Sequence, residues 1–153
     1  MKKSVKVRKI IFEILYYIHT KSTNFEEGFL LFTNNISLSE QERSMVYNVV
    51  LNSIRFNFFI CSVLNKYLKK RTSVKIKILL LSAITQILYL DFKKYAVTND
   101  TVEVSKIKKL NPGLINALLK NISNDCEIIN KEEIDNASVP NWFVNKINKN
   151  NIN

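Results

Sequence analysis

The feature that most constrains the fold of this 153-residue chain is its shortage of residues that break regular structure. It contains two glycines and two prolines, whereas an all-β protein needs many such residues in its tight turns. Hydrophobic residues make up 46% of the chain, which is enough to build a buried core. The sequence therefore predicts an all-α protein with long helices, and its length corresponds to one domain.

Polar residues suited to helix N-termini divide the chain into segments. The candidate N-caps are Asn24, Ser39, Ser73 and Asn111. Ser39 and Glu42 form the S-x-x-E pattern of a capping box. Pro112 fits the first position of a helix, because the N–H that proline lacks would be unpaired there. We expect about seven helices, the first over residues 5–20 and the sixth beginning at Thr98 or Asn99.

One apolar stripe is longer than the others. Its residues recur at helical spacing and are Ile76, Leu79, Leu80, Ala83, Ile84, Ile87 and Leu88. Because Leu81 and Leu90 widen the stripe, we expect this helix to be buried on several sides at the centre of the fold.

The composition changes after residue 124. Residues 125–136 contain five acidic residues and one lysine, and their hydrophobic periodicity lapses. We interpret them as an acidic linker or a loosely packed arm, followed by a short helix that contains Trp142 and by a disordered tail. The predicted organisation is a helical domain over residues 1–124 and a C-terminal extension over residues 125–153.

The net charge of +10 and the pI of about 9.6 favour an anionic partner such as nucleic acid. An alternative explanation stays open, since lysine, asparagine and isoleucine share A/T-rich codons and genome composition alone can enrich them. The placement of the charges is more informative. Lys2, Lys3, Lys6, Arg8 and Lys9 lie within nine residues that contain no acid. The helix dipole disfavours cations at a helix start, so this cluster indicates a binding role.

The residues needed for most catalytic and metal sites are missing from the sequence. With His19 as the one histidine, neither a histidine cluster nor a histidine-paired nucleophile can be built. Cys61 and Cys126 are too far apart in sequence to suggest zinc spacing, and we expect Cys61 to be a small core residue. We therefore expect no catalytic residue, no metal and no cofactor. Residues 78–90 are too short to span a bilayer, so we expect a cytoplasmic protein without a membrane partner.

Several motifs in residues 76–122 occur in the order found in a known family. They are Gln86 in TQILYL, Thr101-Val102-Glu103, and Asn116 in GLINALLK. Together with Glu42-Arg43 at the start of the third helix, they resemble the RNA-binding helical domain of the NusB antitermination factors and of RsmB-type ribosomal RNA cytosine methyltransferases. The resemblance covers about residues 4–122 and implies a single NusB-like bundle with a short additional C-terminal helix.

The resemblance also implies partners and contact residues. In NusB proteins the basic start of the first helix contacts RNA, which implies RNA contacts for Lys2, Lys3, Lys6, Arg8 and Lys9. We expect that replacing Lys6, Arg8 and Lys9 together would weaken RNA binding and leave the core intact. Lys93, Lys94 and Tyr95 replace a proline-containing connection of the family, and this pair of cations beside an aromatic ring suits phosphate contact and base stacking. A solvated lysine pair beside a core tyrosine is the open alternative.

Three functions remain open at this point. The first is a non-catalytic RNA-binding domain that acts in ribosomal RNA maturation or transcription antitermination. The second is the N-terminal, substrate-positioning domain of a 16S ribosomal RNA cytosine-5 methyltransferase, because GLINALLKNI and SVPNWFVNKI are similar to the RsmB branch. The third is a protein-interaction module that pairs with a small-subunit ribosomal protein or with a second copy of itself.

Overall fold

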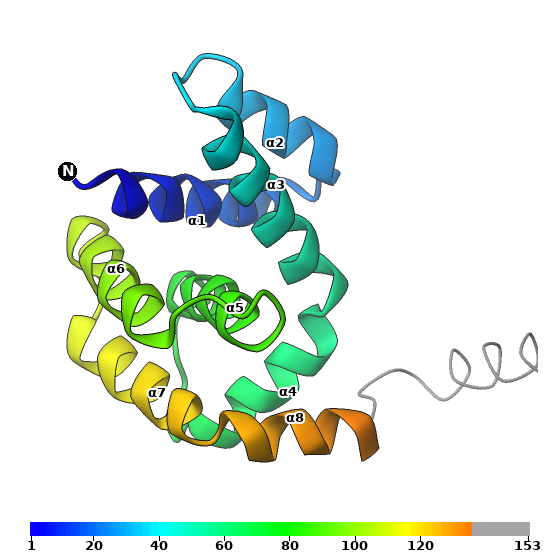
Figure 1. The fold of residues 1–153 in the computed structure, drawn as a ribbon, viewed down its shortest axis with the longest axis vertical. Helices are drawn as coiled ribbons and strands as arrows, with labels where there is room; N and C mark the ends of the chain where they lie inside the picture. Colours follow the sequence, from blue (N-terminus) through cyan, green and yellow to red (C-terminus); the bar gives the residue numbers. More distant parts are fainter. Residues whose placement is uncertain (136–153) are drawn as a thin grey trace, which may run out of the picture.

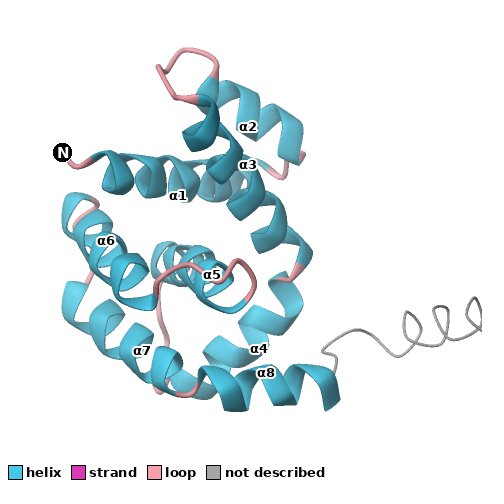
Figure 2. Cartoon of the chain, viewed as in Figure 1, coloured by secondary structure: helices cyan, strands magenta, loops and turns pink. Residues whose placement is uncertain are grey.

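The computed structural model describes residues 1–135, the last five by their backbone. Eight helices follow one another in the described part of the chain, which contains no strand (Figure 2). They are α1 (Lys3–Lys21), α2 (Phe25–Thr33), α3 (Glu40–Arg55), α4 (Asn57–Tyr67), α5 (Val74–Leu88), α6 (Lys94–Ile107), α7 (Pro112–Asn124) and α8 (Cys126–Asp135). The all-α prediction is confirmed.

Helix α5 lies at the centre of the fold, as the long apolar stripe predicts. It contacts α1, α3, α4, α6 and α7, which surround it in Figure 1. Leu80, Ala83 and Ile84 have no exposed surface, and Leu79 is 1% exposed. A helix that is apolar on most of its circumference must be covered on most sides, and five neighbouring helices provide that cover.

The predicted N-caps are confirmed. In each case a side-chain oxygen accepts a hydrogen bond from the backbone N–H three residues later. The pairs are Asn24–Glu27, Ser39–Glu42, Ser73–Ile76 and Asn111–Leu114. At α3 the Glu42 carboxylate also accepts from the backbone N–H of Ser39, at 3.1 Å, which completes the capping box.

The predicted start of the sixth helix is wrong. Helix α6 begins at Lys94, four residues before Thr98. The Thr98 hydroxyl donates to the carbonyl oxygen of Lys94 at 2.8 Å, one turn back inside the same helix. A threonine hydroxyl can either cap a helix start or bond to a carbonyl one turn back in a helix interior. Thr98 makes the interior bond.

The interpretation of residues 125–136 as a linker does not hold for residues 126–135, which form α8. Cys126 and Ile129 are buried, and α8 packs on α7. The hydroxyl of Tyr67 on α4 donates to Asp125 at 2.7 Å, which ties the start of this segment to α4. The predicted Trp142-containing helix and tail lie outside the described residues.

Within residues 1–135, each helix taken singly is too short or too polar to cross a bilayer. The bent pair α3 and α4, which meet at 76°, reaches the required length and apolar content when both helices are counted together.

Candidate nucleic-acid interface

The start of α1 concentrates positive charge at the positive end of a helix dipole. Lys2, Lys3 and Lys6 are exposed there, and the first turn contains no acidic residue. Lys2 occupies the N-cap position, and its side chain caps none of the free backbone N–H groups. Cations at this end oppose the dipole, so the arrangement costs stability unless an anion binds to both the lysines and the free N–H groups.

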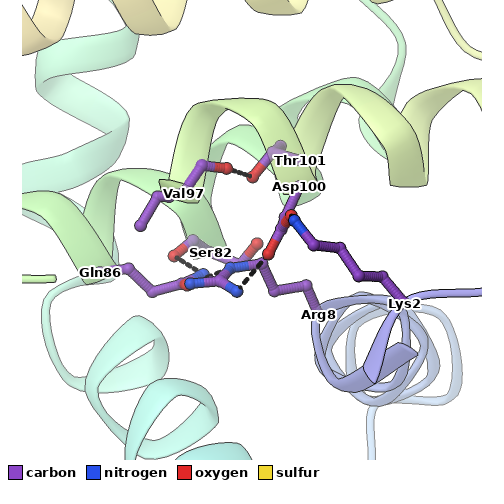
Figure 3. Close-up of polar contacts among 7 residues, drawn as sticks. All are labelled: Lys2, Arg8, Ser82, Gln86, Val97, Asp100 and Thr101. Atoms are coloured by element: carbon purple, nitrogen blue, oxygen red, sulfur yellow. Dashed lines mark hydrogen bonds and ion pairs between the residues drawn. The ribbon is translucent and has the colours of Figure 1, made fainter. Parts of the chain in front are cut away.

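Arg8 belongs to the same cluster in the sequence but lies inside the protein. Its side chain is 9% exposed. The guanidinium Nε donates to Gln86 Oε1 on α5 at 2.8 Å, and one terminal nitrogen donates to Asp100 Oδ2 on α6 at 2.7 Å (Figure 3). Burial lowers the pKa of Arg8, and the neighbouring Asp100 carboxylate partly offsets that effect. Arg8 therefore joins three helices, and its buried guanidinium is not placed at the surface to meet a phosphate.

The hydrogen bonds around Arg8 continue into the neighbouring helices. Gln86 donates through Nε2 to the carbonyl oxygen of Ser82 at 3.0 Å, so both ends of its amide are used. Lys2 Nζ lies 3.8 Å from the second carboxylate oxygen of Asp100. Figure 3 shows the Lys2 side chain extending toward Asp100. This side chain is 76% exposed, so the long contact leaves its charge at the surface.

The buried contacts of Arg8 argue against the expectation that the core tolerates the combined loss of Lys6, Arg8 and Lys9. Removal of Arg8 would leave Asp100, whose side chain is 5% exposed, without its closest cation. The sequence carried a signal for this role. Arg8 lies one helical turn from Ile11 and Phe12, both buried, so it falls within the apolar face of α1. Gln86, quoted above as a motif residue, is its partner.

Lys3, Lys6 and Lys9 of α1 lie near two neighbouring helices. Lys9 Nζ lies 3.4 Å from Glu13, which also pairs with Lys108 at 2.7 Å. Bonds from the backbone and side chain of Ser39 lower the pKa of Glu42, and the charges of Lys3 and Lys6 add to this effect. Lys3 and Lys6 are therefore near the start of α3, whereas Lys9 faces the end of α6. No motif in the sequence distinguishes Lys108, which directly follows α6.

Lys93, Lys94 and Tyr95 are all exposed at the start of α6. The side chain of the N-cap residue Lys93 makes no capping bond, and the first turn contains no acid. Tyr95 is 72% exposed. The alternative in which this tyrosine anchors the core is therefore excluded, and its ring is open to a stacking partner.

The basic starts of α1 and α6 belong to two helices that pack against each other. Helix α1 contacts α6, and Lys2 reaches Asp100, which follows Lys94 by six residues, or roughly 9 Å along α6. A cavity of about 560 Å³ opens beside Lys2, between α6 and the start of α7. Its polar lining includes Asn99, Lys106 and Asn116.

The described residues contain no group of three or more His, Cys, Asp and Glu side chains placed to hold a metal ion. Cys126 is buried, but Cys61 is exposed, contrary to the expectation of a core residue. Its neighbours Ile60 and Leu64 occupy the buried face of α4, which turns Cys61 outward. Partial burial raises the pKa of the Cys61 thiol, and the nearby charge of Lys77 opposes this shift.

Comparison with known protein families finds a match between residues 5–124 and the family described as the NusB family. The matched residues cover α1 from residue 5 onward and continue to the end of α7. They include Lys6 and the basic start of α6, but not Lys2 and Lys3. Comparison with curated proteins finds no match. Members of the matching family bind RNA, and its domain is in general non-catalytic.

Proposed function

The chain belongs to the NusB family, and from this premise we propose that it binds precursor ribosomal RNA as a non-catalytic factor in ribosomal RNA maturation or antitermination. The observation that carries the proposal is the uncapped start of α1 with exposed Lys2, Lys3 and Lys6. Phosphate groups would neutralise the lysines and accept from the free N–H groups of the first turn.

The second basic helix start extends this surface. Lys93 and Lys94 would hold further phosphates, and the exposed ring of Tyr95 would stack on an unpaired base. Lys9 would contribute less than the other lysines, because it already pairs with Glu13. Arg8 would act indirectly, by fixing α1 against α5 and α6. In this arrangement the lysines provide affinity, and the tyrosine favours single-stranded RNA.

The test compares two triple variants that remove the same charge. Lys2→Gln, Lys3→Gln, Lys6→Gln alters the proposed surface, and Lys69→Gln, Lys70→Gln, Arg71→Gln alters exposed cations after α4. Fluorescence anisotropy with a labelled precursor ribosomal RNA leader would be measured over a range of salt concentrations. Each lost phosphate contact should reduce the slope of log K against log salt by roughly 0.7, or about 2 for all three. The control triple should keep most of the original slope.

A separate variant tests stacking. Tyr95→Ala should weaken binding by about 1–3 kcal/mol while leaving the salt slope unchanged, because no charge is removed. If both triple variants weaken RNA binding equally, the lysines act only through the net charge of the protein. That result would overturn the assignment of the RNA surface. A shuffled leader that binds as tightly as the natural sequence would refute the choice of precursor ribosomal RNA.

The sequence GLINALLKNI in α7 favours a second candidate, the substrate-positioning domain of a ribosomal RNA cytosine-5 methyltransferase. In that case the same surface would hold the RNA, and a separate cofactor-binding domain would carry out methyl transfer. The two candidates differ in the gene. A reading frame that continues beyond residue 153 into a Gly-rich cofactor pocket would establish the second candidate.

A further inference from the structure

A second hollow lies at the other end of α1 from the basic cluster. It has a volume of about 460 Å³ and is bordered by α1, α3, α4 and α5. Its apolar wall consists of Leu15, Ile18, Ile54, Val74, Ile78 and Leu81. His19, at this end, follows Lys6 by 13 residues, which places the hollow roughly 20 Å along α1 from the proposed RNA contacts.

The apolar wall continues to the protein surface. Val74 is 46% exposed and Ile54 is 40% exposed. They belong to the hollow together with the buried Leu15 and Ile78, so the exposed apolar surface is continuous with the core. Apolar residues grouped around a concave surface are typical of a site that a partner covers.

The described lining of the hollow contains one charged side chain, and it is basic. Lys77 lies in its lining with His19 and Asn57, and none of the described residues that line it is Asp or Glu. Among the described ion pairs none involves Lys77. An apolar wall with an unpaired cation at its edge fits a ligand that is apolar on one side and acidic on the other.

We propose that this hollow binds an acidic amphipathic helix of a partner protein. Two or three apolar side chains, spaced by one helical turn, would enter the hollow between Ile18, Ile54 and Val74. A carboxylate on the same helix would pair with Lys77, and the Asn57 amide would donate to its backbone or side chains. RNA is the less suitable occupant, because the described lining is mainly apolar and Lys77 is its one Lys or Arg side chain, which offers little to a phosphate backbone.

The direct test uses a designed peptide as the probe. A fluorescein-labelled helical peptide would carry leucines at positions i, i+4 and i+7 and glutamates on its other faces. A matched peptide would replace each glutamate with lysine. The acidic peptide should bind the full-length protein, and the basic peptide should bind at least tenfold more weakly.

Two protein variants locate the peptide. Lys77→Glu should weaken binding about tenfold, because it replaces an attraction to the acidic peptide with a repulsion. Lys120→Glu makes the same charge change on the exposed face of α7 and should leave binding unchanged. Far-ultraviolet circular dichroism would verify that both variants fold.

Cys61 provides an independent readout, since its exposed thiol lies in the lining of the hollow. The bound acidic peptide should slow alkylation of Cys61 by iodoacetamide several-fold. Unchanged alkylation, equal binding of the two peptides, or equal effects of Lys77→Glu and Lys120→Glu would each overturn the proposal. Displacement of the peptide by the RNA leader would also overturn it, by assigning the hollow to the RNA surface. RNA affinity should be the same in both variants, so this test and that of the proposed function can fail separately.

Discussion

At the scale of single residues, the basic start of the chain contains side chains with different roles. Lys2, Lys3 and Lys6 keep their charges at the surface, whereas Arg8 lies against Gln86 and Asp100. A guanidinium suits this buried position because its planar fork can serve two acceptors at once. Neighbouring cations in the sequence therefore differ in function, and the direction in which each leaves the helix decides which role it has.

Arg8→Ala should lower the free energy of unfolding by about 3 kcal/mol, because it leaves the Asp100 carboxylate buried without its main partner. Lys6→Ala removes an exposed cation from the same helix and should change stability by less than about 0.5 kcal/mol. Urea unfolding followed by circular dichroism would compare the two variants. Identical midpoints would show that the contacts of Arg8 add nothing to stability.

At the scale of helices, starts were easier to predict than ends. A side-chain oxygen marks the start of α2, α3, α5 and α7, because it is the chemical group that satisfies a free N–H. The residues with positive φ near helix ends are Ser22, Asp91 and Lys109, none of which is glycine. After α6, the left-handed turn at Lys109 lets Leu110 donate to the Ser105 carbonyl at 2.8 Å. Nothing in the sequence distinguishes these residues from other polar residues.

The capping box of α3 predicts a pH dependence. Hydrogen bonds from Ser39 lower the folded-state pKa of Glu42 below its ordinary value of 4.5. A carboxylate with a lowered pKa stabilises the fold above its unfolded-state pKa, and this contribution is lost as the pH falls through the folded-state value. Glu42→Gln should therefore be less stable than the wild type at neutral pH, and the difference should shrink as the pH falls below about 4.5.

Urea midpoints measured from neutral pH to pH 3 would test this prediction. Glu40→Gln is the matched control, since Glu40 also lies in the first turn of α3 and its carboxylate is not part of the capping box. A difference between Glu42→Gln and the wild type that stays constant with pH would contradict the assigned role of the carboxylate.

At the scale of the whole molecule, the position of α5 makes the fold a single cooperative unit. Five helices pack on it, so none of them keeps its buried face if α5 is displaced. Leu80→Ala would open a cavity at a fully buried position and should lower the free energy of unfolding by about 2–5 kcal/mol. Leu31→Ala, at a position that is 54% exposed, is the control.

Hydrogen exchange would show whether the loss of stability in Leu80→Ala extends to all the helices that pack on α5. In Leu80→Ala the most protected amides of α1, α3, α6 and α7 should all lose protection by the same free energy. Loss confined to α5 and one neighbour would contradict the single cooperative unit. Leu31→Ala should leave these amides unchanged.

The sequence by itself determined the helical class, the central helix and the capped helix starts, since these depend on local spacing and local hydrogen bonds. It also singled out the lysines at the start of α1 and the pair Lys93 and Lys94, although it assigned that pair to the connection before α6. The tertiary structure decided what depends on contacts between distant segments. Arg8 is separated from Gln86 by 78 residues and from Asp100 by 92, so no local pattern could reveal their contact. Likewise, Cys126 and Ile129 are the buried residues within 126–130 of α8, and the packing of α8 on α7 shows that this helix belongs to the fold.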